Sequence, residues 1–228
     1  MELSFCFHIA LRNPGLRPPL NLAGKLRRLL VDKLLSKTDF ERRREVPDLP
    51  VLPLHCERRG AYSTHLQKPS ASLLKSLQFD IIVNFTNYIL RGEILTLPRF
   101  GVWSYHHGDP SEFRGYPPGF WEIYQAAPTT GAILQKLEER LDDGVVLRKA
   151  TFPTVHHSYF LQRQQLFSIT IPWMAEVAED ILRGRSPELE KSDSKAQGPI
   201  YSRASHLQLL RFLLVLLKNK ATRLIRKQ

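Results

Sequence analysis

The chain has few of the residues that mark several protein classes. Its two cysteines, Cys6 and Cys56, are too few for a disulfide framework and too far apart in sequence for a metal-binding pair. The N-terminal segment MELSFCFHIALR has an acidic residue where a secretion signal needs basic ones. The most apolar stretch, 207–217, is far shorter than the roughly 20 residues that cross a bilayer. We therefore expect a protein of the cytoplasm.

Acidic residues are also scarce relative to basic ones. The 228 residues include 33 Lys and Arg but only 22 Asp and Glu, which gives a net charge of +11 and favours anionic partners. The excess positive charge gathers in 25–44 and 211–227, while 101–147 has no excess of Lys and Arg. This distribution predicts that the basic surface lies outside the site.

Residues 1–50 contain no strand followed by a Gly-rich turn, with which open parallel sheets usually begin. Apolar runs predict strands at 51–56, 79–85, 101–107, 129–137 and 145–152. Helical spacing of apolar residues predicts helices at 22–35, 70–77, 91–98, 118–126 and 158–185. Ser70 or Ser72 would cap the second helix, and Pro172 would bend the last. This alternation predicts an α/β fold with a Rossmann-like open, mostly parallel sheet flanked by helices, lacking the usual first strand and Gly-rich turn.

The chain divides by composition into three parts. We expect a helical or irregular N-terminal extension over 1–48, an α/β domain over 49–185, and a linker with a basic amphipathic C-terminal helix over 186–228.

The stretch 101–147 has the groups best suited to chemistry. In a strand GVWSYHH, alternate side chains point to opposite faces, so Ser104 and His106 point together and His107 points the other way. The following loop, with Asp109 and Arg114, can only run over the surface, where binding and catalytic groups concentrate. The pattern predicts a functional site at the end of this strand.

Three runs in this order resemble the formyltransferase fold that uses 10-formyltetrahydrofolate: FDIIVNFTNYILRGEIL, SYHHGDPSEFRGYPPGFWEIY and TTGAILQKLEERLDDGVVL. The resemblance covers about residues 51–185. Its motifs are a His closing a strand, an Arg-Gly pair before a Pro and a Trp-bearing helix, a Thr-Gly strand and a Leu-Asp-x-Gly turn. They fall on His106, Arg114-Gly115, Pro118, Trp121, Thr130-Gly131, Asp142 and Gly144. The His-His-Gly-Asp form resembles a glycan-associated branch of this family.

The resemblance implies transfer of a formyl group to a primary amine, through a tetrahedral intermediate. His106 would hydrogen-bond the oxyanion and help to protonate the leaving folate nitrogen, and Asp142 would orient its imidazole. Ser104 departs from the family, which has Asn there, and a serine cannot offer the same donor. His107, Asn84 or Asn87 would have to compensate.

The same resemblance implies two binding regions. The co-substrate would contact Phe85, Thr86, Asn87, Tyr88, Ile89, Leu90, Leu141 and Asp143. The acceptor would contact His107, Asp109, Arg114 and Trp121.

Structural roles for several of these residues stay open. His107 can pack against the sheet, Trp121 can belong to the core, and Asp109 and Asp143 can simply form turns. The pair His156-His157 has no partner at metal-ligand spacing, so no metal is expected.

The acceptor and partners follow from the C-terminal part. Family members that formylate initiator tRNA carry a separate C-terminal β-barrel, whereas the residues after Gly184 predict a linker and a helix, so no nucleic-acid partner is expected. The acceptor is predicted to be a small-molecule amine, an amino sugar linked to a nucleotide or a lipid. The cationic helix over 205–227 would lie on an acidic membrane, dock on its own domain or form a homodimer.

Two other functions remain open at this point. One is a non-catalytic binding protein that keeps the formyltransferase fold, and the other is a hydrolase that releases formate.

Overall fold

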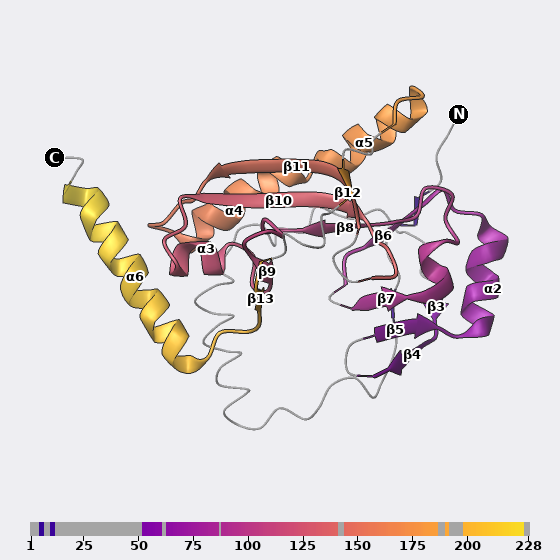
Figure 1. The fold of residues 1–228 in the computed structure, drawn as a ribbon, viewed down its shortest axis with the longest axis horizontal. Helices are drawn as coiled ribbons and strands as arrows, with labels where there is room; N and C mark the ends of the chain where they lie inside the picture. The colour runs from indigo at the N-terminus through magenta and orange to yellow at the C-terminus, as the bar shows by residue number, and fades with distance from the viewer. Residues whose placement is uncertain are drawn as a thin grey trace.

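A six-stranded sheet runs through the centre of the protein (Figure 1). The structure, a computed structural model, describes residues 5–6, 10–11, 52–60, 63–86, 88–140, 144–186, 190–191 and 198–225. In sheet order the strands are β1 (Phe5–Cys6), β6 (Ile81–Asn84), β8 (Val102–His106), β10 (Thr129–Lys136), β11 (Val145–Pro153) and β12 (Glu190–Lys191). The first three are parallel and the others pair antiparallel. The predicted α/β class and Rossmann-like arrangement are confirmed, but the expectation of a mostly parallel sheet is wrong, because two of its five strand pairings are parallel and three are antiparallel.

A first strand is present, which corrects one part of the prediction. Phe5 and Cys6 pair in parallel with Ile81 and Ile82 of β6. Strand β2 (Ala10–Leu11) pairs in parallel with β3 (Pro53–Leu54). Two-residue strands are too short to produce a periodic apolar pattern, so the sequence does not reveal them. The predicted lack of a Gly-rich turn is not tested, because 7–9 and 12–51 lie outside the described residues, as does the helix predicted at 22–35.

A smaller sheet and one helix form the end of the molecule at the right of Figure 1. Its elements are β4 (Cys56–Arg59), β5 (Ser63–Leu66), α2 (Lys68–Leu77), β7 (Ile89–Arg91) and the 3-10 helix η2 (Gly92–Leu95). Helix α2 begins two residues before Ser70, so the predicted Ser70 or Ser72 cap is wrong. Ser70 is instead buried, and its Oγ accepts a hydrogen bond of 2.7 Å from the His55 N–H.

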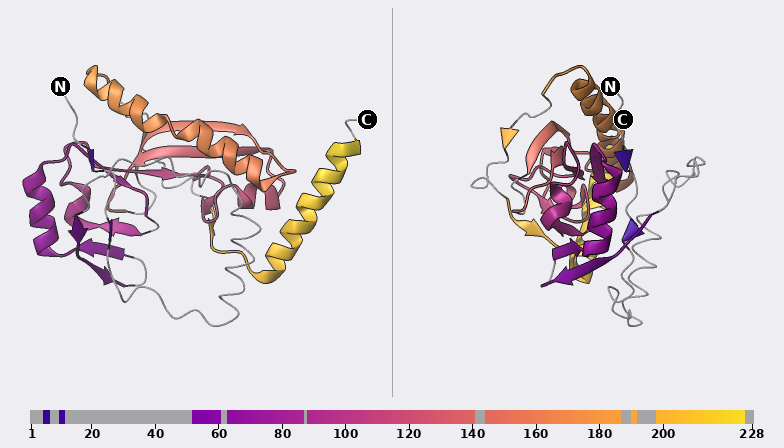
Figure 2. Two further views of the ribbon diagram at one scale, coloured as in Figure 1. Left: turned by 180° about the vertical axis from the view of Figure 1, so that it is seen from behind. Right: turned by 90° about the vertical axis from the view of Figure 1, so that its right-hand side faces the viewer.

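Alternating side chains of the central strands pack into separate cores on the two faces of the sheet. Trp103 of β8 is buried against α4 (Tyr159–Thr170) and α5 (Trp173–Leu182), which cross β10 and β11 (Figure 2). Val102, the preceding residue, packs in the core beside α2 and the small sheet. Pro172 separates α4 from α5, as predicted. The face assignments predicted for GVWSYHH therefore hold for the buried part of β8.

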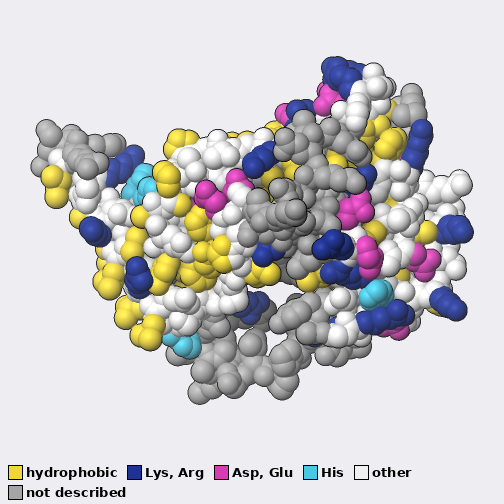
Figure 3. Space-filling view, viewed as in Figure 1, with side chains coloured by type: hydrophobic (Ala, Val, Ile, Leu, Met, Phe, Trp, Pro, Cys, Tyr) yellow, Lys and Arg dark blue, Asp and Glu magenta, His cyan; other side chains and the backbone are white. Residues whose placement is uncertain are grey.

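The long helix α6 (His206–Ile225) docks on α3 (Phe120–Tyr124). Its Phe212 is 1% exposed, with its ring stacked 4.1 Å from the Phe120 ring. The Asn219 side chain donates a hydrogen bond of 3.1 Å to the His156 carbonyl. Docking on its own domain was one of the three expected positions of this helix. In Figure 3, hydrophobic side chains remain visible along α6, at the left of the view.

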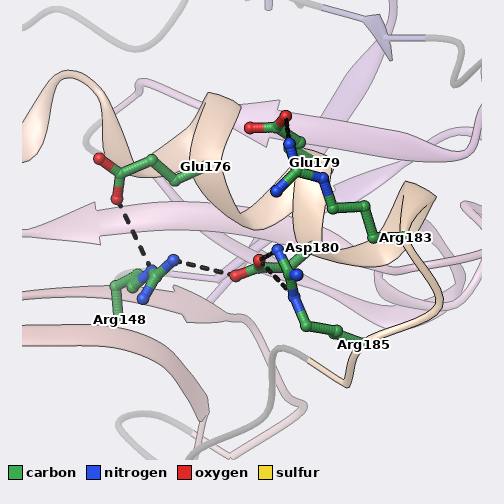
Figure 4. A network of polar contacts seen from close by, with 6 residues as sticks. All are labelled: Arg148, Glu176, Glu179, Asp180, Arg183 and Arg185. Carbon is green, nitrogen blue, oxygen red and sulfur yellow. Dashed lines mark hydrogen bonds and ion pairs between the residues drawn. The ribbon is translucent and has the colours of Figure 1, made fainter.

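Ion pairs join α5 to β11 (Figure 4). The Arg148 guanidinium lies 2.9 Å from the Asp180 carboxylate and 3.8 Å from that of Glu176. Arg185 also binds Asp180, and its hydrogen bond is the main reason that the pKa of Asp180 lies below its ordinary value. Ion pairs in contact with solvent contribute little to stability, so these pairs orient α5 more than they stabilise the fold.

The docking of α6 leads to a prediction for Phe212→Ala. Replacing a buried Phe with Ala lowers stability by about 3–5 kcal/mol. Here the stabilising free energy lost should be that of the contact between α3 and α6. Hydrogen exchange of the α6 amides should accelerate by at least about a hundredfold while β10 and β11 keep their protection. Leu214→Ala is the control, because Leu214 is on the same helix but exposed. Unchanged exchange in α6 would contradict the docked arrangement.

Candidate active site

A pocket of about 530 Å³ lies where β6 and β8 end. The two strands pair with Asn84 beside Ser104, so their carboxyl ends meet at the same edge of the sheet. The predicted site residues in its wall are Thr86, Tyr88, Ile89, Leu90, Ser104, His106, His107 and Arg114. A larger cavity of about 830 Å³, beside Gly101, Lys136 and Arg185, contains none of the predicted site residues.

The turn after β6 shapes one wall of the pocket. Asn84 Oδ1 accepts hydrogen bonds from the Thr86 N–H at 3.0 Å and from the Thr86 hydroxyl at 2.6 Å. The Tyr88 N–H in turn donates to Thr86 Oγ1 at 3.2 Å. An Asn side chain that bonds to the backbone two residues on is typical of a tight turn. This turn leads the chain from β6 into β7 along the pocket.

Ser104 and His106 face the pocket from β8, and each bonds to a backbone carbonyl. The Ser104 hydroxyl donates to the Asn84 oxygen at 3.1 Å. His106 Nε2 lies 3.1 Å from the Phe113 oxygen, and a carbonyl can only accept, so Nε2 carries the proton and Nδ1 is the acceptor of the neutral ring. A Cβ at Gly108 would lie 2.6 Å from the same oxygen. Glycine at position 108 therefore lets the Phe113 carbonyl come close enough to bond to the His106 imidazole and fix its position.

His107 also lines the pocket but packs between the sheet and α4. Its Nε2 is 3.3 Å from Thr170 Oγ1, and its ring contacts those of Tyr105 and Phe167. Burial, followed by electrostatic interactions with His106 and Arg163, lowers the pKa of His107 to about 4. A ring that stays neutral and packed in this way fits the structural role left open for it.

Asp109 forms a turn away from the pocket wall. Its Oδ1 accepts bonds from the Ser111 N–H at 2.9 Å and from the Ser111 hydroxyl at 2.6 Å, and Oδ2 is 3.4 Å from Lys149 Nζ. Burial opposes ionisation, but the bonds from Ser111 and the charge of Lys149 outweigh it, so the pKa of Asp109 is lowered. Phe85 is likewise absent from the wall, and its side chain is 60% exposed.

A segment far along the chain completes the pocket. Strand β9 (Arg114–Gly115) pairs in parallel with β13 (Ile200–Tyr201), and Arg114 Nε donates to the Gly198 carbonyl at 2.7 Å. A Cβ at Gly115 would lie 1.9 Å from the Tyr201 oxygen, so only glycine permits this pairing. The pairing brings Ile200 and Arg203 into the pocket wall.

Trp121 supports this segment without lining the pocket. Its ring stacks on Tyr201 at 4.8 Å, and its Nε1 donates to the Tyr116 carbonyl at 3.1 Å. It is buried, with 6% of its surface exposed. These contacts favour the core role that the sequence left open for Trp121.

The described residues that line the pocket carry an excess of positive charge. Four arginines line it, Arg91, Arg114, Arg140 and Arg203, and Glu138 is the one carboxylate among the described lining residues. The expectation that the basic surface lies outside the site is therefore wrong for the pocket. Arg91 and Arg203 come from segments outside 101–147, so the charge balance of that stretch did not count them. Such a pocket favours an anionic ligand.

Four predicted site residues lie outside the described residues: Asn87, Leu141, Asp142 and Asp143. The position of Asp142 relative to His106 therefore stays a prediction. Among the residues that the structure does describe, no group of His, Cys, Asp and Glu side chains is arranged to hold a metal ion.

A buried carboxyl group lies in α3, which the sequence did not single out. Glu122 is 2% exposed, and its Oε1 has no hydrogen-bond partner in the described part of the chain. Burial, with a smaller contribution from the charge of Glu112, raises the pKa of Glu122 to about 7. Within FWEIY a glutamate looks like an ordinary polar residue of a short helix, so nothing in the sequence marks it.

The raised pKa of Glu122 predicts a pH-dependent stability. The folded state holds this proton up to about pH 7, whereas the ordinary value is 4.5, so stability from this group is complete below 4.5 and falls as the pH rises toward 7. Glu122→Gln should remove that fall, which makes the variant more stable than the wild type at pH 8 by about 3 kcal/mol. Urea unfolding at pH 5 and pH 8 measures this. The exposed Glu179→Gln is the control, and equal pH dependence of wild type and Glu122→Gln would refute the prediction.

Comparisons with known proteins point to formyltransferases. No family model matches the chain. Methionyl-tRNA formyltransferase of Prochlorococcus marinus (strain MIT 9215) is 38% identical over 80 residues, which are 35% of this chain and 24% of that protein. The enzyme of the same name from Synechococcus sp. (strain CC9902) is 29% identical over 147 residues, 62% of this chain and 43% of that protein. The chain thus spans less than half the length of these curated relatives.

A solved structure from Mycobacterium tuberculosis, described as that of a candidate sugar N-formyltransferase, resembles this fold with a TM-score of 0.53. It shares 13% identity and covers 75% of this chain and 72% of that one. The likeness shows that the chain has the fold of that structure.

Proposed function

We propose that the chain transfers a formyl group from 10-formyltetrahydrofolate to a primary amine, and that the amine belongs to an amino sugar. The observation that carries this proposal is the pocket at the end of β6 and β8. It gathers Asn84, Thr86 and 88–90 with Ser104 and His106, which belong to the groups that the formyltransferase resemblance assigns to folate binding and catalysis. The similarity to curated formyltransferases supports the same chemistry.

The proposed reaction requires one bond to form and one to break. The amine nitrogen attacks the formyl carbon, and the resulting tetrahedral intermediate collapses with cleavage of the bond to the folate nitrogen. One proton leaves the amine and one reaches the folate nitrogen, so the reaction needs no oxidant or reductant. The protein has to stabilise the oxyanion and relocate these protons.

His106 is the group proposed for the proton transfers. The Phe113 carbonyl holds its ring, and Nδ1 is the acceptor of the neutral imidazole. Asp142 is proposed, as the resemblance implies, to orient the same ring in its protonated form, in which Nδ1 also carries a proton and can donate to a carboxylate. The Ser104 hydroxyl is bonded to the Asn84 carbonyl, so the missing oxyanion donor has to come from another group. Asn84 and Gln135 are the carboxamide side chains among the described lining residues, and we assign them as the candidates.

The acceptor is proposed to carry phosphate groups, as a nucleotide-linked or lipid-linked amino sugar does. The pocket arginines come from two groups of segments. Arg91 follows the 84–90 segment and Arg140 precedes Asp142, and these are the segments assigned to folate by resemblance. Arg114 belongs to β9, and Arg203 follows β13, which pairs with β9. These two arginines are the ones proposed to meet the acceptor.

The test of the reaction uses the full chain with 10-formyltetrahydrofolate and candidate amino-sugar nucleotides. His106→Ala should lower turnover by at least about a hundredfold, the usual contribution of a general acid or base, and Asp142→Asn should lower it less. His65→Ala is the matched control, because His65 is on β5 and does not line the pocket. Product mass spectrometry reports the formylated amine, and thermal melting confirms that each variant folds.

Other outcomes of this experiment would reject the proposal. Equal turnover in wild type and both variants would remove the assigned roles. Folate binding by calorimetry with no turnover would favour a non-catalytic binding protein, and formate release without any amine would favour a hydrolase. Formylation of methionyl-tRNA but of no amino sugar would refute the acceptor assignment.

The acceptor side of the pocket gives a separate prediction for Arg203→Gln. Loss of one partly exposed charge-assisted contact should raise KM for the sugar nucleotide by about three- to tenfold, with KM for the folate unchanged. Arg183→Gln is the control outside the pocket, because Arg183 directly follows α5 and pairs with Glu179. An increase in KM for the folate alone would place Arg203 on the other substrate.

A further inference from the structure

Helix α6 has two apolar faces, and only one is covered. Leu209, Phe212 and Leu216 pack in the cluster with α3. Six other large apolar residues of the helix are each more than half exposed: Leu207, Leu210, Leu214, Leu217, Leu224 and Ile225. A contiguous apolar surface of this kind on a folded protein marks an interaction site.

The exposed residues form one stripe along the helix. With 3.6 residues per turn, the six side chains fall within an arc of about 100°. Phe212 lies on the opposite side of the helix, against Phe120. The stripe therefore faces away from the domain along the 20 residues of α6, a length of about 30 Å.

Basic residues border the stripe on both edges. By the same helical spacing, Arg211 and Lys218 lie along one edge and Lys220 along the other, and all three side chains are exposed. Residues 199–228 contain seven Lys or Arg and no Asp or Glu. In Figure 3, Lys and Arg side chains lie among the hydrophobic ones in the region of α6.

We propose that this face of α6 binds the surface of a bilayer that contains anionic lipids, with the helix lying in the plane of the interface. The stripe would enter the boundary between headgroups and acyl chains, while the flanking cations bind lipid phosphates. No helix in the described ranges has the length and apolar character to pass through a bilayer. A helix lying in the interface is consistent with that finding.

The charge pattern favours a lipid surface over a second copy of this chain. In a symmetric dimer the same surface of both subunits meets, so the cations beside one stripe would lie against those beside the other. No carboxylate in 199–228 is available to pair with them. Like charges at such a contact oppose association, whereas anionic lipids neutralise them.

The test is flotation of the full chain with vesicles on a density gradient. Binding is expected to vesicles of equimolar phosphatidylcholine and phosphatidylglycerol, and much less to phosphatidylcholine alone. The triple variant Leu210→Gln, Leu214→Gln and Leu217→Gln should weaken the partition at least about tenfold. The double variant Lys218→Gln and Lys220→Gln should weaken it by a similar factor and reduce its salt dependence.

Ile171→Gln is the matched control, because Ile171 is 60% exposed but lies between α4 and α5. It should bind vesicles like the wild type. Circular dichroism should show unchanged helix content in all variants, since the substituted side chains are exposed.

Absence of vesicle binding by the full chain, or equal binding by the triple variant, would overturn the proposal. A dimer in light scattering that the triple variant converts to a monomer would assign the stripe to self-association instead. None of these measurements depends on formyl transfer, so the membrane proposal and the proposed reaction fail separately.

Discussion

The parallel pairing of β6 with β8 is the constraint on which the pocket depends. It sets Asn84 beside Ser104, so both strands end at one edge of the sheet. The turn after Asn84 and the imidazole of His106 then occupy adjacent walls of the same pocket. Buried Trp103 and Val102 hold β8 from its two faces. A slip of one residue would exchange these faces and turn His106 away from the pocket.

The elements that were predicted well have strong local patterns. Strand β6 is a continuous apolar run, β8 alternates between two cores, and Pro172 cannot continue the helix that precedes it. The pocket residues Ser104 and His106 followed from the same alternation. Local patterns also gave a wrong prediction where a side chain can form more than one kind of hydrogen bond. Ser70 has the residue type of a helix cap, but its hydroxyl accepts a hydrogen bond from the backbone N–H of His55.

The rest of the site depends on contacts between distant segments, which leave no local pattern. Arg203 joins the pocket because β13 pairs with β9, and neither two-residue strand has a periodic signature. Glu122 lies in α3, whose neighbours Trp121 and Ile123 pack with Phe212 of α6 in one core cluster, and it is itself buried. The Arg-Gly motif needs its glycine because the Tyr201 carbonyl lies where a Cβ of residue 115 would be, and only the structure shows this contact. Sequence alone indicated that Gly115 matters but not which backbone it meets.

The β9–β13 pairing also bears on the order in which the protein is made. Arg114 and Ile200 are 86 positions apart, yet they are direct neighbours in the wall of the pocket. During synthesis the chain emerges from its N-terminus, so β6, β8 and β10 can fold together while β13 is still inside the ribosome. The nascent protein therefore has its central sheet before it has a closed pocket, and the pocket wall is completed only after β13 has emerged.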